Sequence, residues 1–207
     1  MERSIAPEIK LICNRGPTHY GIAMGTSYFD NYFQTITNRL GDIAVDALLE
    51  GVGLIKDARE AGAKVILAGN GGSAAMASHV TVDLLKCANV RAINFNEADL
   101  ITCFANDYGY AHWVEEALKV YGAASDLAIL ISSSGQSENM LNAAKEAKQQ
   151  GMKVMTLTGF DADNPLRSLG DLNLWVDSSH YNTVEMAHHI WLLSMVDFIA
   201  ERTDKRA

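Results

Sequence analysis

The feature that most constrains the fold is a regular alternation of short apolar runs and helical stretches beyond residue 64. The apolar runs have the length of strands that are buried on both faces of a sheet. Most of the segments between them carry apolar residues at three- and four-residue spacing, which is typical of helices. Strands that alternate with helices indicate a parallel sheet covered on both faces. Strands are predicted at 65–68, 91–94, 127–131, 154–157 and 172–176, and helices at 74–86, 112–120, 138–150 and 184–202.

Length and composition place this alternation in one compact domain. The 207 residues are 48% hydrophobic and include only three prolines, which fits a chain with a sizeable core. A net charge of −8 argues against a nucleic-acid partner. The three cysteines are widely spaced and resemble reduced thiols of a cytoplasmic protein. No run approaches the roughly 18 apolar residues of a membrane-spanning helix, and the charged first 24 residues do not resemble a signal peptide. We therefore expect a cytoplasmic protein with no membrane partner.

The first 61 residues precede the alternation. Residues 1–25 are predicted to be an extension that lies across the surface or across a partner subunit, and residues 26–207 to form the single domain. From residue 26 to about 61, apolar side chains recur at helical spacing, and Gly41, Gly51 and Gly53 are candidate breaks between two long helices. Four residues of the first helix are expected to be buried between subunits: Phe29, Tyr32, Phe33 and Ile36.

The strand at 65–68 leads directly through Gly-Asn-Gly-Gly-Ser, residues 69–73, into a helix. Glycines let the backbone approach a ligand, Ser73 is a candidate N-cap, and the N-terminus of a helix favours an anion such as phosphate. The pattern Gly-x-Gly-x-x-Ala also fits a dinucleotide-binding loop, and a tight turn without a ligand is a third interpretation. Asn94 weakens the dinucleotide interpretation, because it stands where an acidic residue is expected to hold the ribose.

A second loop of the same kind, Ser-Ser-Ser-Gly-Gln-Ser at residues 132–137, follows the strand at 127–131. Serine hydroxyls and backbone N–H groups, without the lysine of a P-loop, suit a terminal sugar phosphate better than a triphosphate. Ligands of parallel sheets bind beyond the carboxyl ends of the strands, where both loops lie. The predicted phosphate-binding residues are Asn70, Gly71, Gly72, Ser73, Ser132, Ser133, Ser134 and Ser137.

The segments GNGGSAAMASH, SSSGQS, GMKVMTLTGF and VEMAHHI resemble the sugar isomerase (SIS) domain. Within it, residues 28 to 202 look like the phosphoheptose isomerase branch, which also includes a non-enzymatic regulator of replication initiation. The resemblance implies a three-layer α-β-α sandwich with a five-stranded parallel sheet in flavodoxin-like order. It also implies a homotetramer with active sites between subunits, and no required cofactor. The implied reaction converts sedoheptulose 7-phosphate to a D-glycero-heptose 7-phosphate for the heptose of surface polysaccharides.

Moving a carbonyl along a sugar needs a base for a carbon-bound proton and an acid for the oxygens. His79 and Asp83 are four residues apart and therefore share one face of a helix. The family carries a histidine at the first position and a catalytic glutamate at the second. By the same resemblance, Asp107 of FANDYGY matches an aspartate that lines the sugar site.

The last helix departs from the family. Glu185 stands at the position of a glutamine, and Leu193 at that of a histidine that serves as the other acid/base and in some members ligates zinc. His188 and His189 are candidate substitutes, since Glu185 and His188 are separated by one helical turn. Since adjacent histidines cannot both face one site, either His188 or His189 is expected to point to the core or to solvent.

These departures leave three functions open. The first is an isomerase that uses Asp83, Glu185 and His188 as catalytic residues. The second is a SIS protein that binds a sugar phosphate, or a protein partner, without turning it over. The third isomerises a different phosphosugar, with Asp83 and Glu185 sharing the proton work. A zinc site is also possible on this pattern, with the ligands His79, Asp83, Glu185 and His188.

Overall fold

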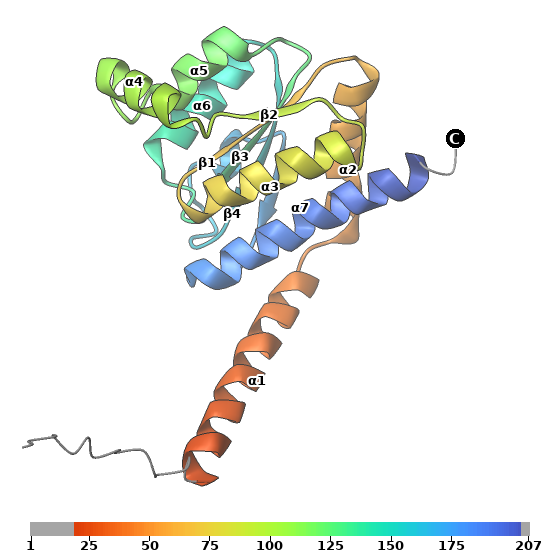
Figure 1. The fold of residues 1–207 in the computed structure, drawn as a ribbon, viewed down its shortest axis with the longest axis vertical. Helices are drawn as coiled ribbons and strands as arrows, with labels where there is room; N and C mark the ends of the chain where they lie inside the picture. The colour runs from red at the N-terminus through yellow and green to blue at the C-terminus, as the bar shows by residue number, and fades with distance from the viewer. Residues whose placement is uncertain (1–18, 204–207) are drawn as a thin grey trace, which may run out of the picture. The chain divides into compact units, whose positions relative to one another are not determined.

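The computed structural model describes residues 19–203, and the side chains of residues 25–202. The chain divides into two units, Met1–Thr35 and Ile36–Ala207. Helix α1 (His19–Gly41) supplies all that is described of the first unit (Figure 1). Along this helix the rings of Tyr28 and Tyr32 stack at 6.3 Å and those of Phe29 and Phe33 at 6.4 Å. Tyr28, Phe29 and Phe33 are more than half exposed, so the aromatic face of α1 is left open within its own unit.

The second unit is built on a five-stranded parallel sheet (Figure 1). Its strand order is β2-β1-β3-β4-β5, the flavodoxin-like order implied by the sequence resemblance. The strands begin and end within two residues of their predicted bounds, because each contains a short run rich in apolar residues. They are β1 (Val65–Gly69), β2 (Ala92–Asn94), β3 (Leu127–Ser132), β4 (Lys153–Thr158) and β5 (Leu172–Trp175).

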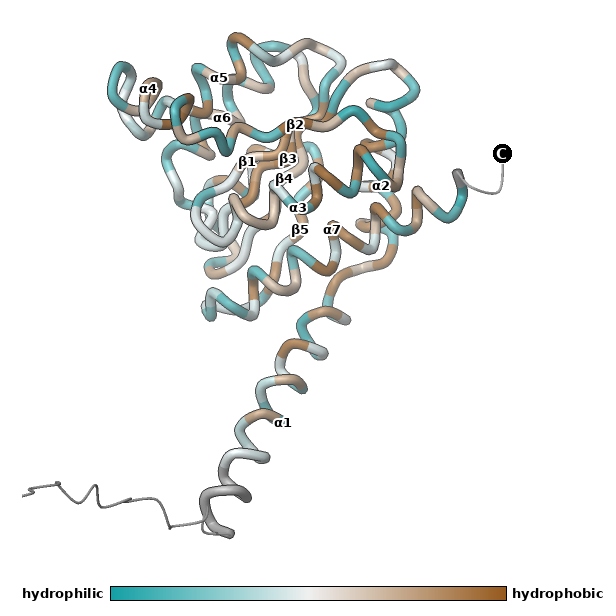
Figure 2. The backbone as a smooth tube through the Cα atoms, in the orientation of Figure 1, coloured by the Kyte–Doolittle hydropathy of each residue, from teal (hydrophilic) through white to brown (hydrophobic). Residues whose placement is uncertain are grey.

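Helices cover both faces of the sheet and give the three layers that the alternation predicted. One face packs against α2 (Val45–Glu60), α3 (Gly72–Lys86) and α7 (Tyr181–Thr203). The other packs against α4 (Ala98–Tyr108), α5 (Trp113–Tyr121) and α6 (Glu138–Gln149). Alternate residues of β1 enter the two cores, Val65 and Leu67 on one side and Ile66 and Ala68 on the other. Hydrophobic colours mark the central strands in Figure 2. No described helix has the length and apolar character needed to cross a membrane.

Three local features differ from, or refine, the sequence prediction. The two N-terminal helices separate after Gly41, whereas Gly51 and Gly53 lie inside α2. Helix α4 was not predicted; none of its residues is fully buried, although Leu100, Ile101 and Phe104 pack against the core at helical spacing. The prediction that Ser73 caps α3 is wrong: the helix begins at Gly72, and its N-cap is Gly71 at φ 53°. That positive φ is readily adopted by glycine and brings Ser73 into the buried first turn of the helix.

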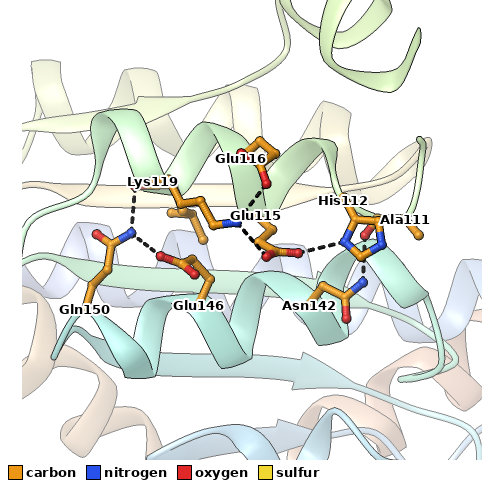
Figure 3. Close-up of polar contacts among 9 residues, drawn as sticks. Ala111, His112, Glu115, Glu116, Lys119, Asn142, Glu146 and Gln150 are labelled. Carbon is orange, nitrogen blue, oxygen red and sulfur yellow. Dashed lines mark hydrogen bonds and ion pairs between the residues drawn. The ribbon is translucent and has the colours of Figure 1, made fainter. Parts of the chain in front are cut away.

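The outer helices α5 and α6 are joined by polar contacts (Figure 3). Asn142 donates from Nδ2 to the carbonyl oxygen of Ala111 at 2.9 Å, and Gln150 donates from Nε2 to that of Leu118 at 3.1 Å. Along α5, Lys119 donates to both Glu115 and Glu116. Hydrogen bonds from His112 and Lys119 lower the pKa of Glu115. These contacts hold α5 and α6 together in the outer layer. None of their side chains lines the cavity between the loops at residues 69–73 and 132–137, which are called the serine loops below.

Candidate functional site

The two serine loops meet at one cavity. They leave β1 and β3, which are hydrogen-bonded neighbours in the sheet, at the carboxyl ends of both strands. The cavity has a volume of about 170 Å³ and is closed on one side by the first residues of α7. Of the predicted phosphate-binding residues, Gly71 and Gly72 do not line it. The lining residues are Asn70, Ser73, Ile131, Ser132, Ser133, Ser134, Ser137, Tyr181 and Glu185.

Two helix N-termini give the cavity a positive electrostatic character. Ser73 lies in the first turn of α3, and Ser137 directly precedes α6. The unpaired N–H groups and the dipole at such N-termini favour an anion. The lining contains no Lys or Arg among the described residues, and its one formally charged side chain is Glu185. The cavity therefore combines neutral anion-binding groups with a single carboxylate.

The serine hydroxyls of the second loop differ in what they already bind. Ser132 donates from Oγ to Oγ of Ser137 at 3.0 Å, and Ser134 Oγ accepts from the backbone N–H of Gln136 at 3.2 Å. Ser133 is 5% exposed, and its Oγ has no hydrogen-bond partner among the described residues. A buried hydroxyl without a partner is costly, so an unpaired group at a cavity indicates a ligand or ordered water there.

The side chain of Asn70 joins three segments beside the cavity. Its Oδ1 accepts from Asn139 Nδ2 at 2.8 Å and from Tyr110 Oη at 2.9 Å. Its Nδ2 donates to Asn139 Oδ1 at 3.0 Å. Asn70 thereby connects the first serine loop with α6 and with the segment that follows α4. The sequence analysis missed Asn139 and Tyr110, because nothing in their local pattern indicates contacts so distant along the chain.

Glu185 lies against the first turn of α3. A Cβ atom at Gly72 would fall 2.5 Å from a carboxylate oxygen of Glu185, so glycine at this position lets α7 approach the turn closely. Tyr181, the first residue of α7, also lines the cavity. The N-terminal turns of α7 therefore form a wall of the site, and any anion bound between the serine loops meets the carboxylate of Glu185.

His79 and Asp83 lie together on α3, with His79 Nε2 at 3.3 Å from Asp83 Oδ2. On the other side of His79, Nδ1 lies 3.0 Å from Nε2 of His189 on α7. The two imidazole rings meet edge to face at 5.0 Å. Asp83 and His79 are thus close enough for an ion pair on α3, and the hydrogen bond between His79 and His189 joins α3 to α7. The spacing of His79 and Asp83 predicts the first pair. Of the two candidate histidines on α7, the partner of His79 is His189 and not His188, which was placed among the catalytic residues.

His188 points away from this line. It is fully buried, and its Nε2 lies 3.0 Å from the carbonyl oxygen of Thr158 at the end of β4. Its Nδ1 has no hydrogen-bond partner among the described residues. Burial lowers the pKa of His188 to about 4, against the opposing effect of the bond to Thr158. The expectation that His188 contacts a sugar does not fit this position, whereas the expectation that one of the adjacent histidines is a core residue does.

The four predicted zinc ligands are not brought together. Within residues 25–202, the structure has no group of three or more His, Cys, Asp or Glu side chains that could hold a metal ion. The burial of His188 explains why the predicted set does not converge. Leu193, at the position of the family histidine, packs against the core formed by α2, α3 and α7.

Asp107 lies outside the serine cavity. It is on α4, exposed, with Oδ1 accepting from Asn106 Nδ2 at 2.9 Å and Oδ2 at 3.8 Å from Cys103 Sγ. The link between its segment and the cavity is instead Tyr110, through the bond to Asn70.

Comparison with known proteins adds the following similarities. The SIS domain family model matches residues 28–159. A phosphoheptose isomerase from Enterobacter sp. (strain 638) is 32% identical over 163 residues, which cover 76% of this chain and 83% of that protein. A phosphoheptose isomerase from Helicobacter pylori (strain ATCC 700392 / 26695) is 32% identical over 160 residues, 74% of this chain and 83% of that protein. The solved structure of a phosphoheptose isomerase from Neisseria gonorrhoeae superposes with a TM-score of 0.79 at 25% identity, covering 86% of this chain and 98% of that one.

Proposed function

This chain belongs to the SIS domain family, and from that membership we propose that it is a phosphosugar aldose–ketose isomerase. The substrate we propose is sedoheptulose 7-phosphate, and the product a D-glycero-heptose 7-phosphate for surface-polysaccharide heptose, made in the cytoplasm. The observation that carries the proposal is the single cavity shared by both serine loops and two helix N-termini. The phosphoheptose isomerases that are 32% identical to most of this chain support the choice of a heptose phosphate.

The phosphate is proposed to bind between the serine loops. Ser133 is the natural donor, because its buried Oγ has no partner among the described residues. The backbone N–H groups that begin α3 and α6 add donors without the cost of ordering long side chains. A neutral set of donors of this kind holds the phosphate and leaves Glu185 of the same cavity available to the sugar.

The proton transfers are assigned to two carboxylates on α3 and α7. Asp83, 3.3 Å from His79 Nε2, is proposed as the base that removes the proton beside the carbonyl, and Glu185 as the group that exchanges protons with the sugar oxygens. Glu185 lines the cavity in which the phosphate is proposed to bind. Asp83 lies ten positions after Ser73, about 15 Å further along the axis of α3, and would therefore act at the end of the sugar remote from the phosphate. The acid and base are side chains of this chain, so the proposed reaction needs no cofactor.

The working form is proposed to be an assembly of identical copies, a tetramer as in the family. Four apolar side chains on neighbouring helices α3 and α7 are exposed by two fifths or more, a surface that a second copy would cover: Val82, Leu85, Met186 and Ile190. They lie on the two helices that carry His79, Asp83 and His189, so association at this surface would enclose the proposed acid/base groups.

The experiment that tests the function follows deuterium incorporation into sedoheptulose 7-phosphate in deuterated water. An isomerase incorporates deuterium next to the carbonyl and forms the aldoheptose phosphate. Asp83→Asn should reduce the exchange rate at least about a hundredfold, the lower range of a general base, while binding of inorganic phosphate persists. Asp83→Glu should retain exchange because it preserves the carboxylate. Wild-type protein that binds the sugar phosphate without any exchange would contradict the isomerase.

A second candidate is a SIS protein that binds a sugar phosphate without turning it over. The observation that favours it is Leu193, an apolar side chain packed on the core where the family resemblance expects a histidine. The same experiment separates the two candidates. A binder shows saturable affinity for the sugar phosphate and no deuterium incorporation in either the wild type or Asp83→Glu.

A further inference from the structure

The amide side chain of Asn70 has one hydrogen-bonding group left for a ligand. An amide oxygen has two lone pairs, and an amide nitrogen has two N–H groups. Asn70 Oδ1 accepts from Asn139 Nδ2 at 2.8 Å and from Tyr110 Oη at 2.9 Å, which occupies both lone pairs. Asn70 Nδ2 donates to Asn139 Oδ1 at 3.0 Å, and its second N–H has no partner among the described residues. Because Asn70 lines the cavity between the serine loops, this N–H is what its side chain can offer there.

The orientation of this amide decides whether Asn70 attracts or repels an anion. The last torsion of an asparagine side chain is broad and nearly two-fold, so a rotation of about 180° exchanges the oxygen and the nitrogen. In the orientation of the structure, the free group is an N–H, which can donate to a phosphate. After rotation the free group would be a lone pair of the oxygen, which a phosphate repels. Side chains that hold the amide therefore control phosphate affinity without a contact of their own to the anion.

The two partners of this amide are held by the outer layer of the fold. Asn139 is the second residue of α6 and is 2% exposed. Three residues later, Asn142 donates from Nδ2 to the carbonyl oxygen of Ala111, the neighbour of Tyr110, at 2.9 Å (Figure 3). The ring centroid of Tyr110 also lies 6.4 Å from that of the buried Trp113 on α5. Both partners therefore belong to the bonded layer of α5 and α6, and neither lines the cavity.

We propose that Asn139 and Tyr110 are positioning residues, which fix the amide of Asn70 so that it presents an N–H to a bound phosphate. The reciprocal pair of bonds between the two asparagines survives if both amides rotate together, so the pair alone leaves the orientation open. The proton that Tyr110 donates selects the oxygen of Asn70 and thereby directs the nitrogen to the ligand. The inference rests on the phosphate site of the proposed function and adds two residues to it.

The test begins with the affinity for inorganic phosphate, measured by isothermal titration. Tyr110→Phe should raise the dissociation constant at least about twofold, because the amide then also populates the rotated orientation. Asn139→Ala removes the reciprocal pair and should raise it about tenfold, the equivalent of one hydrogen bond to a charged group. Tyr108→Phe is the matched control and should leave the affinity unchanged. Tyr108 is 52% exposed, near the 57% of Tyr110, and its Oη has no hydrogen bond among the described residues.

A double-mutant cycle separates positioning from a structural role. If Tyr110 and Asn139 act through Asn70, their effects on phosphate affinity should disappear in an Asn70→Ala background. A residue that only stabilises the fold lowers the urea midpoint and leaves the phosphate affinity of the folded protein as it is. Unchanged affinity in Tyr110→Phe, or an effect of the same size with and without Asn70, would overturn the proposal. The exposed Tyr110 carries this test even if Asn139→Ala does not fold.

A spectroscopic measurement observes the N–H itself. In protein labelled with ¹⁵N on asparagine side chains, one Nδ2 proton of Asn70 should shift when inorganic phosphate is added, since a bond to a charged acceptor forms. The other proton, bonded to Asn139, should shift less. The signal is assigned by its loss in Asn70→Ala. Nδ2 protons that do not respond to saturating phosphate would contradict the proposal.

The outcomes for the positioning residues and for the isomerase are distinguishable. A protein that shows these phosphate effects but no deuterium exchange of sedoheptulose 7-phosphate would refute the isomerase and leave the positioning role in place. A protein that exchanges deuterium while the Asn70 signals ignore phosphate would refute the positioning role alone. A wild type that binds no phosphate would refute both the phosphate site and its positioning residues.

Discussion

Glu185 places a carboxylate in a cavity whose other groups favour an anion. The N-termini of α3 and α6 and the hydroxyl of Ser133 attract a phosphate, while Glu185 repels it. The negative charge of Glu185 weakens phosphate binding. A carboxylate in this position is therefore better explained by the proton exchange with the sugar oxygens that we propose for Glu185. The two effects can be separated by removing the charge and keeping the shape of the side chain.

Glu185→Gln should bind inorganic phosphate about threefold to tenfold more tightly, since a repulsion of roughly 1 kcal/mol is removed. Deuterium exchange of the sugar phosphate should decrease in the same variant, because an amide does not transfer the proton. Isothermal titration with inorganic phosphate measures the first effect. Weaker phosphate binding by Glu185→Gln would show that Glu185 holds the anion indirectly rather than repelling it.

His188 makes the stability of the fold depend on pH. Its pKa is about 4 in the folded protein, against an ordinary value of 6.5. Above pH 6.5 the ring of His188 is neutral in both the folded and the unfolded state, so its protonation does not reduce the free energy of unfolding. As the pH falls from 6.5 towards 4, the unfolded state takes up the proton and the folded state does not, so stability decreases by about 3 kcal/mol in total.

Urea unfolding of wild type and His188→Gln between pH 7 and pH 4 checks this prediction. The glutamine variant should lose less stability over that interval, because its amide can donate to Thr158 without titrating. His180→Gln serves as the control and should follow the wild type, because the side chain of His180 is exposed. If His188→Gln does not fold, the ring of His188 can be titrated directly by NMR in the wild type, where a pKa near 6.5 would refute the prediction.

At the scale of elements, the junction between β1 and α3 depends on close approach. A Cβ atom at Gly69 would lie 2.6 Å from the Cβ of Ser73 and 2.9 Å from its backbone carbon. Because the second atom belongs to the backbone of α3, the helix itself would have to move. Gly53, in the middle of α2, has open space where its Cβ would lie.

Gly69→Ala should therefore destabilise the protein by about 1–3 kcal/mol through overpacking. It should also weaken phosphate binding, since the first turn of α3 is displaced. Gly53→Ala should stabilise the protein by about 1 kcal/mol, because alanine is the better helix former. Urea unfolding of the two variants distinguishes these opposite signs. If Gly69→Ala were more stable than the wild type, the steric contact between residue 69 and Ser73 would be contradicted.

Much of the architecture could be predicted because its signals are local. The runs at 65–68 and 127–131 are continuous and apolar, and both end in serine-rich loops, so the sheet and the paired loops follow from neighbouring residues. The bonds of Asn70 to Asn139 and Tyr110 could not be predicted, since they join residues 69 and 40 positions apart. The choice between His188 and His189 could have been made from spacing, because His188 lies three and four residues before the buried Trp191 and Leu192 and therefore shares their face of α7.

At the scale of the whole molecule, the exposed apolar side chains of α3 and α7 predict self-association. Ile190 is 45% exposed on α7. Ile190→Glu should therefore shift the protein towards monomers in sedimentation velocity runs at micromolar concentration, because it places a charge in the proposed interface. Val120→Glu is the control: Val120 is 70% exposed on α5, over the opposite face of the sheet. A wild type that is monomeric at that concentration would contradict both this surface and the predicted burial of Phe29, Tyr32, Phe33 and Ile36.

The position of α7 in the chain has a consequence for biosynthesis. Helix α7 follows every other described element, yet it packs against α2 and α3 and brings Tyr181 and Glu185 to the cavity. During synthesis, both serine loops are therefore translated before the residues of α7 that complete their cavity. Until then the apolar sides of α2 and α3 lack their cover, so an interrupted translation product would be inert and recognisable to chaperones and proteases. Turnover is therefore expected only in molecules in which α7 has packed against α2 and α3.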